Sequence, residues 1–128
     1  MNKTNKGRKA VAEFAEICEN KFRMTVEKAK LVRFGPKDFF GIADLFGYDV
    51  GFWYLIQVKS NGTEGALKLL SQYWKEHKLP FRTRLIVAVR YDGINKGSPS
   101  YWKVHKYKPE RNGWITVLLD KNGDEIVE

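Results

Sequence analysis

Hydrophobic and polar positions divide the chain into two helical segments and several short strands. From about residue 9 to residue 21 a helix is predicted, because apolar side chains recur three or four positions apart; they are Val11, Phe14, Ala15, Cys18 and Phe22. A second helix is predicted to end near His77, and its apolar stripe is Ala66, Leu70, Tyr73, Trp74 and His77. Thr63 or Asn61 is expected to cap the start of this helix.

The remaining apolar stretches predict strands. Residues 29–34, 40–46 and 52–58 form three of them, with a turn at 49–51. The run Leu85–Val89 is apolar throughout, which is typical of a strand that is covered on both faces. Residues 101–107 alternate, and the stretches 114–119 and 125–127 flank Asn122-Gly123, a hairpin signal. The order is α-β-β-β-α-β-β and a small hairpin, in one domain over residues 1–128.

The charge of the chain indicates a polyanionic partner. Its 128 residues carry 23 Lys and Arg against 15 Asp and Glu, a formal net charge of +8. Such a field attracts nucleic acids but does not distinguish DNA from RNA or from an acidic protein. Residues 1–8 are expected to form a flexible basic arm, in which Lys6 and Arg8 contact phosphates together with Lys9. A second basic and aromatic set is either a further contact or a solvated strand face; it comprises Tyr101, Lys103, His105, Lys106, Tyr107 and Lys108.

The cysteine and histidine content excludes several classes of protein. The single cysteine, Cys18, lies on a helical stripe, so we expect a buried thiol in a reducing cytoplasm. His77 and His105 are the only histidines and predict no zinc site, so both are expected to be structural. No phosphate-binding glycine loop is present, which argues against an ATPase or a dinucleotide enzyme. The chain contains no run of about 18 apolar residues, so no membrane span is predicted.

Candidate chemistry lies at the ends of two predicted strands. One carries Gly41-Ile-Ala-Asp44, and the next ends in Gln57-Val-Lys59. Strand side chains alternate between the two faces, so Gln57 and Lys59 project together while Val58 turns into the core. A carboxylate, an amide oxygen and an ammonium group that converge in this way indicate an active site.

Several motifs in this order resemble the PD-(D/E)XK nuclease superfamily, and within it the archaeal Holliday-junction-resolvase-like and VRR-type branch. They are Gly7-Arg8, Glu13, Gly41-Ile-Ala-Asp44, Gln57-Val-Lys59-Ser60 and Gln72, and the resemblance covers about residues 6–90. It implies an α/β, restriction-endonuclease-like fold, in which a mixed central sheet flanked by helices is built from an α-β-β-β-α-β core. Here a C-terminal β-hairpin is added. It also implies a Mg2+- or Mn2+-dependent DNA endonuclease that acts on branched DNA as a homodimer.

The resemblance also implies roles for individual residues. Asp44, the Gln57 side-chain oxygen and the Val58 backbone carbonyl would hold the metal ion, while Lys59 would orient water or stabilise the transition state. Glu13 and Gln72 would complete the site; the alternatives are a solvated glutamate and a surface glutamine.

Gln57 stands where the family usually has Glu, so it offers an oxygen ligand without charge. Metal binding should then be weaker, unless Glu13 compensates. A catalytically weak or inactive nucleic-acid-binding protein of the same fold is therefore the alternative, and a nuclease acting on RNA is another. Apolar area around Trp53, Trp102 and Trp114 is expected to support a dimer.

Overall fold

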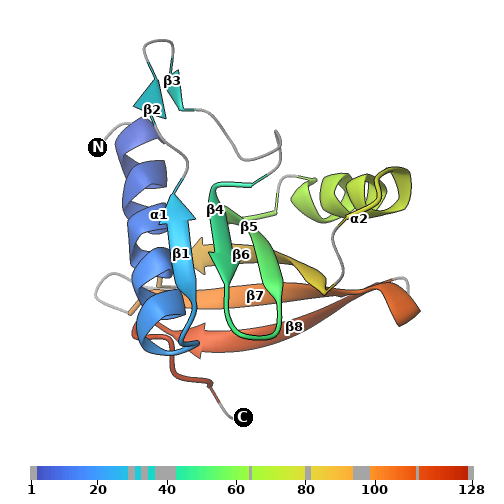
Figure 1. Ribbon diagram of the computed structural model, residues 1–128. Coiled ribbons are helices and arrows are strands. Elements are labelled where there is room, and N and C mark those ends of the chain that lie inside the picture. Colours follow the sequence, from blue (N-terminus) through green and yellow to red (C-terminus); the bar gives the residue numbers. More distant parts are fainter. Residues whose placement is uncertain are drawn as a thin grey trace.

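A six-stranded sheet with one helix on each face organises the chain (Figure 1). The structure is a computed structural model that describes residues 3–28, 31–32, 35–36, 43–63, 65–79, 82–93, 99–111 and 113–126. Its helices are α1 (Lys3–Asn20) and α2 (Ala66–Glu76). The strands of the sheet are β1 (Thr25–Lys28), β4 (Leu45–Tyr48), β5 (Trp53–Ser60), β6 (Thr83–Tyr91), β7 (Tyr101–Lys108) and β8 (Gly113–Asp120). Two further short strands, β2 (Leu31–Val32) and β3 (Gly35–Pro36), form a separate antiparallel pair.

The sheet is mixed, with the order β1-β4-β5-β6-β7-β8. Strands β5 and β6 are parallel and are connected through α2, whereas each other pair of neighbours is antiparallel. Without the β2–β3 pair, the chain runs α-β-β-β-α-β as far as β6, and β7 and β8 then extend the sheet. The predicted α/β class with a mixed, helix-flanked sheet is confirmed at this level.

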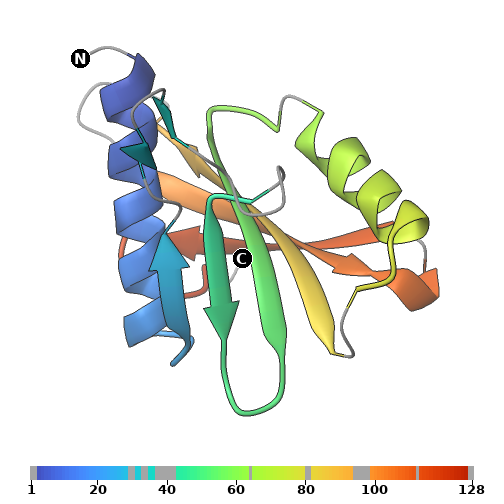
Figure 2. The same cartoon turned by 45° about the horizontal axis from the view of Figure 1, so that its top comes forward.

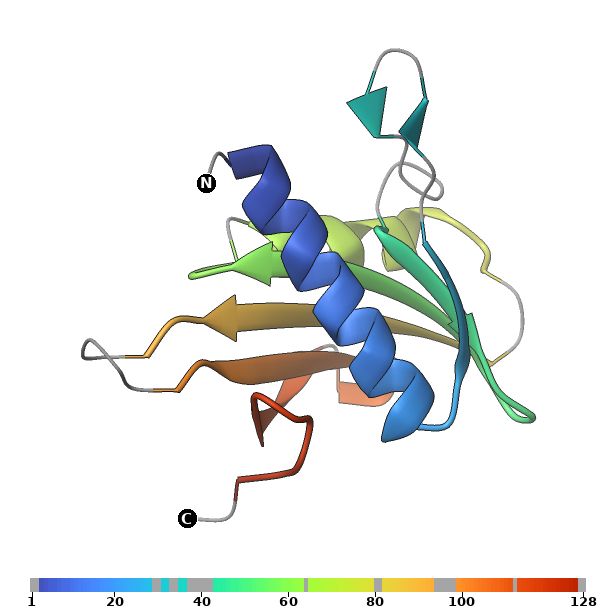
Figure 3. The same ribbon diagram turned by 90° about the vertical axis from the view of Figure 1, so that its left-hand side faces the viewer.

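The core has two layers, one on each side of the sheet, as Figure 3 shows with α1 in front and α2 behind. On the α1 face, Ile86 and Ala88 of β6 pack with Phe14 and Trp102. On the α2 face, the neighbouring positions of β6 pack with helix α2; this cluster includes Leu55, Leu70, Leu85, Val87 and Val89. The prediction that residues 85–89 are covered on both faces is confirmed.

Cys18 lies within the α1 layer and is fully buried, as predicted. Burial, with a smaller contribution from Glu19, raises the pKa of the Cys18 thiol to about 12. The thiol therefore stays protonated and behaves as a small apolar side chain.

The N-terminal prediction was wrong for residues 3–8, which belong to α1 and not to an arm; residues 1–2 lie outside the described part. Residues 3–9 include no large apolar residue, so the sequence has no stripe there from which a helix could be predicted. Strand β1 was also missed, because it is an edge strand in which only Val26 is apolar. Of the strand predicted at 29–34, the structure describes β2 alone, and of that predicted at 40–46 it describes residues 43–46.

The caps and turns differ from prediction in detail. Gly65, with a φ of 80°, precedes α2, and no side chain caps it, so neither Thr63 nor Asn61 has the expected role. The C-terminal hairpin is reduced to one antiparallel bridge between Leu119 and Glu125. No helix in the described ranges is both long and apolar enough to cross a membrane.

The turn after β8 packs against the end of α1. Gly123 has a φ of 92°, and a Cβ atom at this position would lie 2.8 Å from Cγ2 of Ile17. Beside it, Nζ of Lys21 lies 2.8 Å from Oδ1 of Asp124. The close approach of this turn to α1 therefore depends on glycine.

We expect Gly123→Ala to destabilise the protein more than Gly65→Ala. Both glycines have positive φ, so either substitution costs about 1–2 kcal/mol of backbone strain. Only Gly123 adds a clash, which costs about 1–3 kcal/mol more, because no atom lies within 4 Å of a Cβ built at Gly65. Urea denaturation measures both free energies of unfolding, and equal losses would show that the turn does not pack on α1 as described.

Candidate active site

Asp44 joins the start of β4 to the end of β5. Its backbone N–H donates to the carbonyl of Ile56 at 2.9 Å. Its Oδ2 accepts a hydrogen bond from the backbone N–H of Val58 at 2.8 Å. The register pairs Leu45 with Ile56, which places Asp44 beside Gln57. The structure thus brings together the two motifs that lie thirteen positions apart in the sequence.

Gln57 and Lys59 project from the α2 face of β5. Val58 and Ile56 belong to the α1 core cluster, whereas Leu55 belongs to the α2 cluster, so the intervening side chains alternate as predicted. Val58 is 8% exposed and lies in the core. Gln57 and Lys59 are half-buried.

The side-chain oxygen of Gln57 is buried without a hydrogen-bond partner among the described residues. Leaving a buried acceptor unsatisfied costs about 1–3 kcal/mol, so such an atom in a folded protein calls for an explanation. Next to the Asp44 carboxylate, a bound cation is a natural partner for it, because Mg2+ and Mn2+ prefer oxygen ligands.

The backbone carbonyl of Val58 is the third candidate oxygen ligand. The N–H of Val58 points toward Asp44, and the N–H and C=O of a strand residue point to the same side, so its carbonyl faces the same edge. No three His, Cys, Asp or Glu side chains of the described ranges form a metal-binding group. The available donors are therefore one carboxylate and neutral oxygens, which fit a hard cation held weakly.

Glu13 is partly buried, and its partner is Arg90. The Arg90 Nε atom lies 2.8 Å from Oε2 of Glu13, in an ion pair whose atoms are not aligned as a hydrogen bond. Arg90 pairs across the sheet with Trp102 of the α1 cluster, so this contact lies on the α1 face. Glu13 is thus held on the face opposite to Gln57 and Lys59, and the structure does not support its compensating for Gln57.

A polar network that the sequence did not predict continues from this ion pair through Asp92 and Asn61. The Arg90 guanidinium donates to Asp92 at 3.1 Å, and Asp92 exchanges two hydrogen bonds with the Asn61 side chain, each 3.1 Å long. The network ties together the ends of β5 and β6. Its sequence signal is weak: two charged residues that directly follow a long apolar strand.

The other predicted site residues lie apart from Asp44. Gln72 is exposed on α2, turned away from the buried Ala66 and Leu70. Arg8 and Lys9 are exposed on the first turns of α1, and the side chain of Lys6 lies outside the described part.

Asp49 is a turn residue, as expected. Its Oδ1 accepts hydrogen bonds from the N–H groups of Gly51 and Phe52, and its Oδ2 accepts one from the Tyr54 hydroxyl. The backbone N–H of Gly51, followed by the Tyr54 hydroxyl, lowers the pKa of the Asp49 carboxyl against the smaller opposing effect of burial.

Aromatic side chains continue along the α2 face from the Gln57 position. Phe46 and Trp53 stack with centroids 5.5 Å apart, and they line a hollow of about 460 Å3 together with Tyr73 and His77. Tyr48 and Trp53 are 40% and 43% exposed.

The prediction that Trp102 offers exposed apolar area was wrong. Trp102 is 1% exposed and packs on Phe14, because alternation along β7 turns it into the α1 layer. Trp114 is half-buried against Tyr107. Of the three tryptophans, only Trp53 offers a large exposed surface.

Comparison of the chain with protein-family models gives no match, and comparison with curated proteins gives no match either.

Both histidines contact side chains of neighbouring residues. His105 is 9% exposed, and its Nδ1 lies 2.8 Å from Oγ1 of Thr116 on the neighbouring strand. His77 is exposed and contacts Tyr73, with ring centroids 4.0 Å apart and the ring planes tilted by 34°. Burial, and to a lesser degree the charge of Lys103, lowers the pKa of His105.

We expect stability to fall when the pH is lowered below about 6.5, the ordinary pKa of histidine in an unfolded chain. Above that pH His105 is neutral in both the folded and the unfolded chain, so it adds no pH dependence. Below it the unfolded chain binds a proton that the folded protein takes up only at lower pH, so unfolding is favoured. Urea denaturation between about pH 7.5 and pH 5 should show this slope.

His105→Gln should reduce the slope, whereas His77→Gln, at the exposed histidine, should leave it as in the wild type. Equal slopes in all three proteins would show that His105 is not the group responsible.

Proposed function

We propose that this protein is a metal-dependent DNA endonuclease of the PD-(D/E)XK type. The observation that carries the proposal is the Asp44 carboxylate, hydrogen-bonded to the Val58 N–H, next to a buried Gln57 oxygen that has no hydrogen-bond partner among the described residues. The order of elements supports it, because α1, three antiparallel strands, α2 and a parallel β6 follow the α-β-β-β-α-β order expected of a restriction-endonuclease-like core.

In this proposal each residue has its own role in phosphodiester hydrolysis. Asp44 would supply the one negative charge at the ion, and the Val58 N–H holds its carboxylate in place. The Gln57 oxygen and the Val58 carbonyl would add neutral ligands. When bound, Mg2+ or Mn2+ would polarise the phosphoryl oxygen and make a bound water more acidic. Lys59, on the same face as Gln57, would orient the water or stabilise the charge that develops on the phosphoryl group.

Charge and exposed aromatic area support the partners in this proposal. The net charge of +8 favours a polyanion such as DNA, and the exposed Arg8 and Lys9 are suited to phosphate contacts. Exposed Tyr48 and Trp53 offer apolar area to a second copy of the chain. A two-fold dimer would place two sites symmetrically, as cutting two strands of a branched DNA requires.

A catalytically inactive DNA-binding protein of the same fold is the second candidate. Gln57 favours it, because a site with one carboxylate attracts a divalent ion less strongly than a site with two.

We expect Asp44→Asn to abolish cleavage without unfolding the protein. Asparagine keeps an oxygen that can accept from the Val58 N–H, but it removes the only carboxylate of the proposed ligand set. Lys59→Ala should slow cleavage by about 10²–10³-fold and leave DNA binding nearly unchanged. Lys68→Ala, at an exposed lysine of α2, is the control and should cut like the wild type.

The assay uses labelled four-way junction, duplex and single-stranded DNA with Mg2+, with Mn2+ and with chelator, and it measures binding separately. Full activity of Asp44→Asn would refute the site. If the wild type cuts nothing with either metal and Lys59→Ala weakens binding, the binding-only candidate is correct.

Gln57→Glu should tighten Mn2+ binding by about tenfold or more, because it adds a negative charge beside the ion. Gln72→Glu is the matched control: it makes the same chemical change on the exposed face of α2. Calorimetric titration measures both affinities. The same affinity in both variants would mean that position 57 does not face the ion.

A further inference from the structure

Strands β6 and β7 separate at one end of the sheet and leave a pocket on the α1 face. Their pairing ends at Ile86 and Lys106, while β6 continues back to Thr83 beside β5 and β7 continues to Lys108 beside β8. Figure 2 shows the start of β6 and the end of β7 running apart. The resulting hollow has a volume of about 330 Å3. We name it the β6–β7 pocket; it is lined among others by Phe22, Phe52, Tyr54, Arg84, Lys106 and Lys108.

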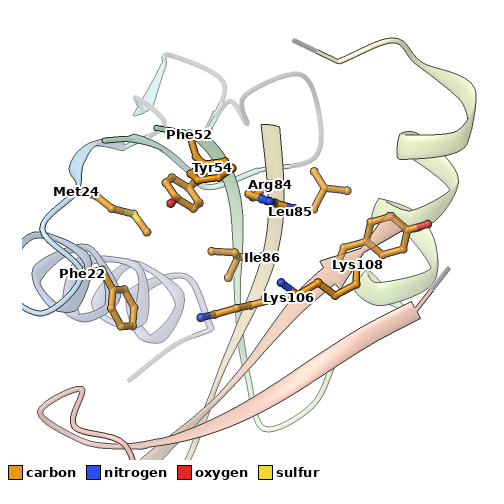
Figure 4. Close-up of a pocket in the computed structure, with 10 residues that line it drawn as sticks. Phe22, Met24, Phe52, Tyr54, Arg84, Leu85, Ile86, Lys106 and Lys108 are labelled. Atoms are coloured by element: carbon orange, nitrogen blue, oxygen red, sulfur yellow. The ribbon is translucent and has the colours of Figure 1, made fainter. Parts of the chain in front are cut away.

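Three cationic side chains enter this pocket from two strands. Figure 4 shows Arg84 of β6 and Lys106 and Lys108 of β7 around the same hollow. In the described part of the chain, no carboxylate forms an ion pair with any of the three. The nearby Asp49 carboxylate is occupied by two backbone N–H groups and the Tyr54 hydroxyl. The pocket therefore carries positive charge that no described residue neutralises with a salt bridge.

Aromatic rings lie beside these cations. The Arg84 guanidinium carbon lies 4.6 Å from the ring centre of Phe52, and Nζ of Lys106 lies 5.9 Å from that of Phe22. Both rings are half-buried, so part of each remains accessible. Tyr54 keeps its proton, because burial, with the hydrogen bond to Asp49, raises its pKa to about 12. The wall of the pocket thus combines cations with apolar ring surface and adds no negative charge of its own.

We propose that the β6–β7 pocket binds a single-stranded segment of nucleic acid, with a phosphate among Arg84, Lys106 and Lys108 and an unpaired base against Phe22 or Phe52. Cations along a groove with aromatic rings beside them are the means by which proteins hold single strands without reading sequence. Arginine contributes twice, since its guanidinium can bind a phosphate and stack on a base.

Shape and charge favour this occupant over its rivals. In a duplex the base faces are stacked on one another, so aromatic rings in a concave pocket have no face to contact. An acidic peptide could pair with the three cations, but its carboxylate side chains leave the ring surfaces unused. A single strand satisfies both parts of the pocket.

This pocket is separate from the proposed active site. Tyr54 and Gln57 lie on opposite faces of β5 and three residues apart, which is about 10 Å of strand. Binding in the pocket therefore needs neither a metal ion nor Asp44, so the proposal stands or fails independently of nuclease activity.

The test measures binding of a fluorescent oligothymidylate of about ten residues by anisotropy, in chelator, over a range of salt concentrations. Replacing both lysines, in Lys106→Ala/Lys108→Ala, should weaken binding by about tenfold or more. It should also reduce the log–log salt slope by about 1.4, at about 0.7 per lost contact on a single strand. Phe22→Leu should weaken binding about tenfold and leave the salt slope unchanged, because it removes stacking alone.

A matched control removes two lysines from α2. Lys68 and Lys75 are exposed there, so Lys68→Ala/Lys75→Ala makes the same change in net charge away from the pocket. It should bind the oligonucleotide within about twofold of the wild type, and thermal unfolding should show that all variants are folded.

Equal losses in the two double variants would overturn the proposal, because net charge alone would then explain the binding. Competition by poly-glutamate as strong as that by unlabelled oligothymidylate would also overturn it, in favour of an acidic peptide. Asp44→Asn should bind the oligonucleotide like the wild type, and failure of cleavage in every assay would leave this expectation unchanged.

Discussion

Strand β5 is the element on which the arrangement of the molecule depends. It pairs with β4 on one side and in parallel with β6 on the other, and its two faces belong to different core layers. Because side chains alternate along a strand, a shift of one residue in its pairing would exchange the two layers and move Gln57 and Lys59 to the α1 face. The buried residues Leu55, Ile56 and Val58 oppose such a shift, and they thereby hold the candidate site in place.

The hydrogen bond from the Val58 N–H to the Asp44 carboxylate belongs both to the pairing of β5 and to the candidate site. It serves the fold, because it satisfies a backbone N–H where the β4–β5 pairing ends, and it directs a carboxylate to the same position. The neighbouring Gln57 oxygen has no such partner. In the proposed site, one neutral ligand in place of a carboxylate would lower the charge, so selectivity for an ion would depend on oxygen geometry more than on electrostatic attraction.

The two faces of the sheet carry different candidate functions. The α2 face presents Gln57 and Lys59 beside exposed aromatic residues, whereas the α1 face presents the positive β6–β7 pocket. The basic set at 101–108 looks continuous in the sequence, but alternation divides it. Lys106 and Lys108 enter the pocket on the α1 face, while His105 and Tyr107 belong to the other face. A nucleic acid that contacted both faces would therefore pass around an end or an edge of the sheet.

The sequence by itself determined the elements whose burial is regular. Helix α2, the doubly covered β6, the α1 stripe and the common face of Gln57 and Lys59 all follow from spacing, because burial on one face imposes a period on the chain. Spacing could not predict the first turns of α1 or the edge strand β1, since neither contains a regular set of apolar residues. Only the tertiary structure decided that Glu13 pairs with Arg90, that Gln72 is exposed, and that β6 and β7 separate to form a pocket. These features depend on how elements distant in sequence meet, and local periodicity carries no information about such contacts.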